Sequence, residues 1–88
     1  RYYALVRGSG LLEEQGEIVA PIGRNPESII TRRVTEDGKY AHTSYKVIER
    51  FGDVYLVDIH LHTGRTHQIR VHFTHIGHPV VNDPFYFG

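Results

Sequence analysis

The residues best suited to chemistry gather in one stretch near the end of the chain, residues 63–72, which reads Thr-Gly-Arg-Thr-His-Gln-Ile-Arg-Val-His. Arg65 and Arg70 carry planar guanidinium groups, which bind carboxylates and phosphates through paired hydrogen bonds. No Asp or Glu occurs between Asp58 and Asp83, whereas that interval holds six of the chain's histidines, whose side chains titrate near neutral pH. A stretch with only positive or titratable side chains favours an anion, so we predict an anion-binding site here.

A glycine and two threonines of this stretch predict a turn followed by the start of a helix. Gly64 can take a positive φ without a Cβ clash, and Thr63 and Thr66 are both possible N-caps. Gly77 followed by Pro79 is typical of a helix end. The apolar stripe of the helix, at spacings of three and four residues, is formed by Ile69, Phe73 and Ile76.

Several polar side chains of this stretch together suit a nucleic acid. Arg65 lies at the mouth of the predicted helix, where both its guanidinium group and the helix dipole favour a phosphate. Gln68 offers a donor and an acceptor for a base edge, and Arg70 falls in the first turn, at the border between core and solvent. Tyr2 or Tyr3 could provide a stacking face for a base. The residues that we predict to bind nucleic acid are Arg65, His67 and Gln68.

Composition narrows the class of protein. The 88 residues make one domain or part of one, and the formal net charge of +0 gives no overall basic signature for nucleic acid. The absence of cysteine excludes disulfides and thiolate metal sites. No apolar run is long enough to span a membrane, and no signal peptide is visible. Because the chain begins at Arg1 and contains no methionine, we expect it to be a piece of a longer protein.

Alternating apolar positions predict an α+β fold, a mainly antiparallel sheet with one principal helix packed on it. We expect Asp37-Gly38 to join two strands in a hairpin, residues 50–53 to form a second hairpin, residues 24–28 to be a loop, and residues 79–81 to pair briefly with the sheet. Exposed sheet edges lead us to expect a marginally stable chain or one that relies on a partner. The predicted strands are 2–6, 17–20, 30–35, 40–47 and 54–61.

Seven histidines also raise the possibility of a metal site. His60 and His62 alternate on one strand face, and His72 and His75 are one helical turn apart, so both pairs have ligand spacing. The stretch around them contains no acidic ligand, and we therefore predict no metal site. A hydrolytic triad has no support either, because Ser44 lies in the middle of a predicted strand.

The motif of residues 63–72 strongly resembles that of the RluA/RluD type of RNA pseudouridine synthase. Downstream, Gly77-His78-Pro79-Val80 and Asp83-Pro84-Phe85-Tyr86 continue the likeness. Upstream, residues 2–8 and residues 38–45 resemble the family's tyrosine-containing strand and its Gly-Lys strand, in the same order. The resemblance covers nearly the whole chain and implies that residues 1–88 are the C-terminal part of a pseudouridine synthase catalytic domain.

This resemblance implies an isomerase that detaches uracil from its ribose, rotates it and reattaches it through C5, with an aspartate as nucleophile and no metal or organic cofactor. Tyr2 falls on the active-site tyrosine that packs against the target base, and Arg70 on the arginine that pairs with the catalytic aspartate. The target uridine would leave the base stack to react. The implied partner is ribosomal or transfer RNA in the cytoplasm, with no membrane and no obligate protein partner.

The chain departs from the family's pattern at the nucleophile. In the family this aspartate lies in an Arg-Leu-Asp motif upstream of the tyrosine strand, which here begins at Tyr2. The aspartates of this chain, Asp37, Asp53, Asp58 and Asp83, do not match it. We therefore expect the longer parent to be an enzyme and the 88-residue chain alone to be inactive. The alternatives are a non-catalytic RNA-binding module and, less favoured, a histidine-rich metal-binding domain.

Overall fold

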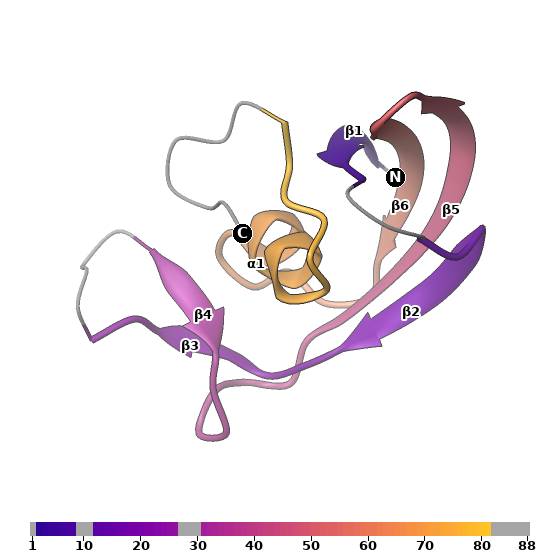
Figure 1. Ribbon diagram of the computed structural model, residues 1–88. Helices are drawn as coiled ribbons and strands as arrows, with labels where there is room; N and C mark the ends of the chain where they lie inside the picture. The colour runs from indigo at the N-terminus through magenta and orange to yellow at the C-terminus, as the bar shows by residue number, and fades with distance from the viewer. Residues whose placement is uncertain (1, 9–11, 27–30, 82–88) are drawn as a thin grey trace.

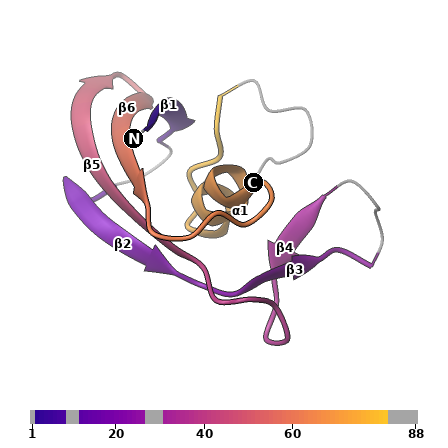
Figure 2. The same cartoon turned by 180° about the vertical axis from the view of Figure 1, so that it is seen from behind.

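The computed structural model describes residues 2–8, 12–26 and 31–81, which form a four-stranded sheet, a two-stranded sheet and a helix. The large sheet is antiparallel with the order β1-β6-β5-β2, and β3 pairs with β4. In both Figure 1 and Figure 2, α1 lies between the curved large sheet and the β3–β4 pair. The predicted α+β class is confirmed. The elements are β1 (Tyr2–Arg7), β2 (Gln15–Val19), β3 (Ile22–Arg24), β4 (Arg32–Val34), β5 (His42–Phe51), β6 (Val54–Leu61) and α1 (Gln68–His75).

Apolar side chains at alternate positions of the large sheet face α1 and form the main core. The predicted inner face of β6 is confirmed, because Tyr55, Val57 and Ile59 are buried. Phe73 of α1 is fully buried among them, and its ring forms a T-shaped contact with that of Tyr45 at a centroid distance of 5.6 Å. Burying a side chain of this size contributes about 1.5–3 kcal/mol. This contact fixes α1 against the sheet.

A second, smaller core lies on the other side of α1. Val71 packs against Ile22 of β3 and Ala41, with Val34 of β4 at its border. The helix is therefore covered on two sides, whereas the sequence predicted a single apolar stripe. The short strand β3 was missed, since three residues are too few to display an alternation.

The predicted hairpin at Asp37-Gly38 is wrong in its pairing. A turn does form, with the Gly38 N–H donating to the carbonyl oxygen of Thr35 at 2.9 Å. However, its two arms pair with β3 rather than with each other, and Ile22 and Lys39 exchange two backbone hydrogen bonds of 2.9 Å. A Cβ on Gly38 would lie 2.6 Å from the carbonyl carbon of Ile22. The glycine therefore permits the close approach of β3.

Two further predictions, the second hairpin and the pairing of residues 79–81, are confirmed. In the predicted loop at residues 24–28, Arg24 belongs instead to β3, and residues 27–28 lie outside the described residues. Strands β5 and β6 form a hairpin closed by the pair Phe51 and Val54. Val80 forms an antiparallel bridge with Val6, so residues 79–81 cover part of the outer edge of β1. Within residues 2–8, 12–26 and 31–81, no helix is long and apolar enough to cross a membrane.

Candidate functional site

The loop that leads into α1 is closed by the side chain of Gln68, the first residue of the helix. Gln68 is only 2% exposed. Its Oε1 accepts hydrogen bonds from the Thr63 hydroxyl at 2.7 Å and the Arg65 N–H at 3.0 Å. Its Nε2 donates to the carbonyl oxygen of His42 at 3.0 Å and to Thr43 Oγ1 at 2.9 Å. Gln68 therefore fastens both the loop and α1 to β5.

The prediction that Gln68 reads a base edge is wrong. A primary amide has two donor hydrogens and an oxygen with two lone pairs, and all four positions are taken by groups of the protein. A residue that was singled out for its free hydrogen-bonding groups instead holds its neighbour Arg65 in place.

A second buried side chain, His72, continues this network. Its Nδ1 lies 2.8 Å from Thr43 Oγ1, and its Nε2 lies 2.9 Å from the carbonyl oxygen of Ala20. The carbonyl can only accept, so the ring hydrogen is on Nε2 and the Thr43 hydroxyl donates to Nδ1. Burial lowers the pKa of His72. With both nitrogens bonded, His72 is no metal ligand in this fold, and its helical spacing to His75 forms no site.

The left-handed residue of the loop is His67, with φ 57° and ψ 24°, and not Gly64 as predicted. His67 is also the N-cap of α1 and makes no side-chain capping hydrogen bond, so the prediction of Thr63 or Thr66 as the cap is wrong. The Thr63 hydroxyl is instead used by Gln68 and by the His42 N–H, which donates to it at 3.0 Å. A left-handed residue other than glycine costs about 1–2 kcal/mol, and such strain gathers at functional sites.

The other end of α1 is as predicted. Gly77 has φ 84°, and its N–H donates to the carbonyl oxygen of Thr74 at 3.0 Å. The His78 N–H donates to the carbonyl oxygen of Phe73 at 2.8 Å. These two bonds form a Schellman motif, which ends the helix.

Arg70 and Tyr2, the two residues that the family resemblance implicates in catalysis, lie on the same side of the sheet. Arg70 is half-buried in the first turn of α1. Tyr2 is paired with Ile59, whose side chain lies in the core that α1 covers, and directly paired residues of antiparallel strands share a face. Tyr2 is 53% exposed, so its ring is accessible. Tyr3 pairs with Asp58 and lies on the opposite face, which leaves Tyr2 as the candidate for stacking.

An open cleft of about 410 Å³ lies between the 63–67 loop and the β3–β4 pair. The Nε of Arg65 donates to the carbonyl oxygen of Tyr40 at 2.7 Å, which holds this side chain at the cleft. The other cations were not predicted, because they lie far from residues 63–72 in the chain and only the fold brings them together. Among the residues that the structure describes, the lining holds one carboxylate, Asp37, and four cations, Arg24, Arg32, Lys39 and Arg65.

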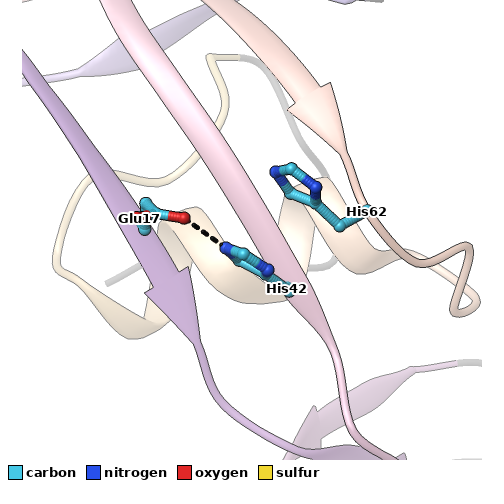
Figure 3. Close-up of side chains that lie close together, drawn as sticks. All are labelled: Glu17, His42 and His62. Carbon is cyan, nitrogen blue, oxygen red and sulfur yellow. Dashed lines mark hydrogen bonds and ion pairs between the residues drawn. The ribbon is translucent and has the colours of Figure 1, made fainter.

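A second polar cluster lies on the face of the sheet turned away from α1. Figure 3 shows Glu17 of β2, His42 of β5 and His62, just after β6, side by side. His42 Nε2 lies 2.5 Å from Glu17 Oε1, and the His42 and His62 rings stack at a centroid distance of 4.0 Å. The hydrogen bond with His42 lowers the pKa of Glu17. The expected absence of an acidic group beside the histidines is therefore wrong, because sheet register brings Glu17 to them.

Comparison with known proteins agrees with the motif. The sequence model of the family described as RNA pseudouridylate synthase matches residues 1–75. The chain is 49% identical over 85 residues to an uncharacterized RNA pseudouridine synthase of Chloroflexus aurantiacus, covering 97% of this chain and 26% of that protein. It is also 49% identical over 85 residues to the ribosomal large subunit pseudouridine synthase D of Nitrosomonas europaea, covering 97% of this chain and 24% of that protein.

A solved structure gives the same result at the level of the fold. The human protein RNA Pseudouridylate Synthase Domain Containing 1 matches with a TM-score of 0.87 and 38% identity, covering 98% of this chain and 39% of that chain. The 88 residues thus span 24–39% of the length of these relatives. The resemblance inferred from residues 63–72 is confirmed, and the chain belongs to the RNA pseudouridylate synthase family.

Proposed function

We propose that these 88 residues form part of the catalytic domain of an RNA pseudouridine synthase, which isomerises uridine to pseudouridine in structured RNA. The observation that carries this proposal is the position of Arg70. It lies half-buried in the first turn of a helix whose first residue, Gln68, is bonded to the sheet and to the preceding loop through all four of its amide positions. A guanidinium group held in this way is suited to orient a carboxylate.

The reaction needs no cofactor, because its atoms balance within the nucleotide. The bond from N1 to C1′ breaks, the base turns, and a bond from C5 to C1′ forms, while C5 loses a proton and N1 gains one. The nucleophilic aspartate, which attacks either the sugar or the base, comes from a part of the synthase outside these residues. Asp58 does not suit this role, since it pairs with Lys46 and Tyr3 on the face away from α1.

In this scheme Arg70 keeps the nucleophilic carboxylate ionised and fixes its orientation. A neighbouring cation lowers the pKa of a carboxyl group, and a planar guanidinium binds both carboxylate oxygens. Tyr2 packs against the target base after that base has left the stack, where an aromatic contact contributes about 1–3 kcal/mol. The exposure of Tyr2 and its position on the α1 side of the sheet support this role.

The cationic cleft is the proposed path of the RNA backbone. Four cations and one carboxylate line it, and one of these cations, Arg65, lies with His67 in the loop that leads to Arg70. Positive charge concentrated in a cleft attracts a polyanion even when the net charge of the chain is +0. The substrate is ribosomal or transfer RNA in the cytoplasm, and the name of the Nitrosomonas relative favours ribosomal RNA.

Replacing Lys39 with alanine tests this path. The Lys39→Ala variant should bind RNA more weakly, and the slope of log affinity against log salt should fall by about 1, as expected for one lost phosphate contact. Lys46→Ala is the matched control, since Lys46 is an exposed lysine on the other face of the sheet. Equal effects of the two substitutions would mean that the cleft is not the RNA path.

Release of tritium from uridine labelled at C5 tests the proposed activity. The longer synthase that contains these residues should release tritium from ribosomal or transfer RNA, and the 88-residue chain alone should release none. Tritium release by the 88-residue chain would contradict the proposal that the nucleophilic aspartate lies outside these residues. RNA binding by the longer protein without tritium release would instead identify a non-catalytic RNA-binding module.

A further inference from the structure

We propose that Glu17, His42 and His62 form a binding site for a divalent transition-metal ion of the zinc class, on the face of the sheet turned away from α1. The site is separate from the RNA surface proposed above and does not depend on it. It rests on three ligand atoms that the sheet brings together from distant parts of the chain.

The ligand atoms are already close to a coordinating arrangement. One nitrogen of each histidine and a carboxylate oxygen of Glu17 all lie within 4.8 Å of one another. Ligand atoms about 2.0–2.2 Å from a tetrahedral zinc ion are roughly 3.3–3.5 Å apart. Side-chain rotations that move the ligand atoms by about an ångström are therefore sufficient to form the site. Figure 3 shows the three side chains converging over adjacent strands.

The backbone beneath these side chains is fixed by sheet hydrogen bonds. The His62 N–H donates to the carbonyl oxygen of His42 at 3.0 Å, which holds the two histidines opposite each other. Glu17 is paired with Ser44, two residues from His42, and so lies diagonally across from that histidine. Sites built on regular strands hold their ligands more precisely than sites on loops.

The donor set suits zinc-class ions better than calcium or magnesium. Two imidazole nitrogens and one carboxylate form a common zinc ligand set that leaves a fourth position open. The His60 ring lies 4.7 Å from that of His62 and is a neighbouring candidate for this position. The Glu17 side chain is 63% exposed and His62 is exposed, so an ion can enter directly from solvent.

Without an ion, two hydrogen bonds occupy the same atoms. His42 Nε2 bonds to Glu17 Oε1, and His62 Nε2 lies 2.7 Å from Ser44 Oγ. Both bonds are exposed, where a hydrogen bond or ion pair contributes little to stability. Zinc can therefore replace these contacts at small cost, whereas it could not displace the buried contacts of His72.

The test is titration of the tag-free 88-residue chain with zinc by isothermal calorimetry, and with cobalt by visible absorption. The variants are Glu17→Gln and His62→Asn, which remove one ligand each from exposed positions, so that folding should persist and can be checked by circular dichroism. The control is His75→Asn, which removes an exposed histidine from α1, outside the cluster.

We expect one ion to bind per chain, with cobalt bands that indicate nitrogen and oxygen ligands. Glu17→Gln and His62→Asn should each weaken zinc binding at least about tenfold, since even indirect partners of a metal commonly contribute 10–100-fold. His75→Asn should bind as the wild type does. The proposal is overturned if the wild type binds no zinc, if either ligand variant binds as tightly as the wild type, or if the control weakens binding equally.

Discussion

The two faces of the four-stranded sheet hold histidines in opposite situations. On the α1 side, His72 is fully buried and both of its ring nitrogens are bonded, to Thr43 and Ala20. On the other side, His42 and His62 reach solvent and bond with exposed partners. Thr43 and His42 are neighbours on β5, so one step along a strand separates a structural contact from an open polar surface.

This difference shows that residue type alone does not decide the role of a polar side chain. When one side chain of a buried hydrogen-bond network is removed, several hydrogen bonds are lost together and water does not replace them. An exposed group exchanges its partner for water at little cost. The α1 face should therefore govern stability, while the outer face should be free to bind an ion.

The largest effect on stability is expected at Gln68. The Gln68→Ala variant removes the hydrogen bonds of the Gln68 amide with the Arg65 N–H, the Thr63 hydroxyl, the His42 carbonyl and Thr43 Oγ1. We expect the free energy of unfolding to fall by about 3 kcal/mol, since each of the four lost hydrogen bonds contributes about 0.5–1.5 kcal/mol. Urea denaturation measures this value. A loss below about 1 kcal/mol would mean that water replaces the amide and that the two faces do not differ as described.

A smaller, pH-dependent effect is expected at His72. Burial lowers its pKa below the ordinary 6.5, so between the two pKa values the unfolded chain binds a proton that the folded chain does not. The free energy of unfolding should therefore fall as pH decreases below about 6.5, by up to about 1.4 kcal/mol per pH unit. Urea denaturation at several pH values should show a shallower dependence for His72→Asn. An unchanged slope in that variant, or an equal change in His75→Asn, would contradict this origin.

The smallest effect is expected on the outer face. Glu17→Gln removes the carboxylate that bonds with His42 at an exposed position, and the midpoint of thermal unfolding at neutral pH should stay at its wild-type value. Differential scanning calorimetry in the absence of metal ions measures it. A clear loss of stability would mean that the outer face supports the fold as the α1 face does.

The sequence was sufficient to predict elements that carry their own local signals. Strand β6 was predicted to its exact bounds because Tyr55, Val57 and Ile59 share one face of a run that is rich in aromatic and β-branched residues. The end of α1 followed from Gly77, and the family followed from the ten-residue motif. In these places short-range periodicity, backbone preference and motif spacing all agree.

Features that depend on pairing between distant segments could not be predicted. The insertion of Ile22 between the arms of the 35–39 turn is set by tertiary contacts, which override the local preference of Asp-Gly for a hairpin. Glu17 and His62 come close together only because β2 and β6 lie on the two sides of β5 in the sheet. The full hydrogen bonding of the Gln68 amide could not be predicted either, since two of its partners, His42 and Thr43, lie on strand β5.

The most direct test of the central claim is the turnover of the longer synthase carrying Arg70→Ala, measured by tritium release from RNA labelled at C5 of uridine. Breaking a partly buried ion pair costs about 3–5 kcal/mol, so turnover should fall at least about a hundredfold, while Arg33→Ala, at an exposed position of β4, should retain it. If Arg70→Ala keeps both the turnover and the melting temperature of the wild type, Arg70 does not orient the nucleophile and the account is contradicted.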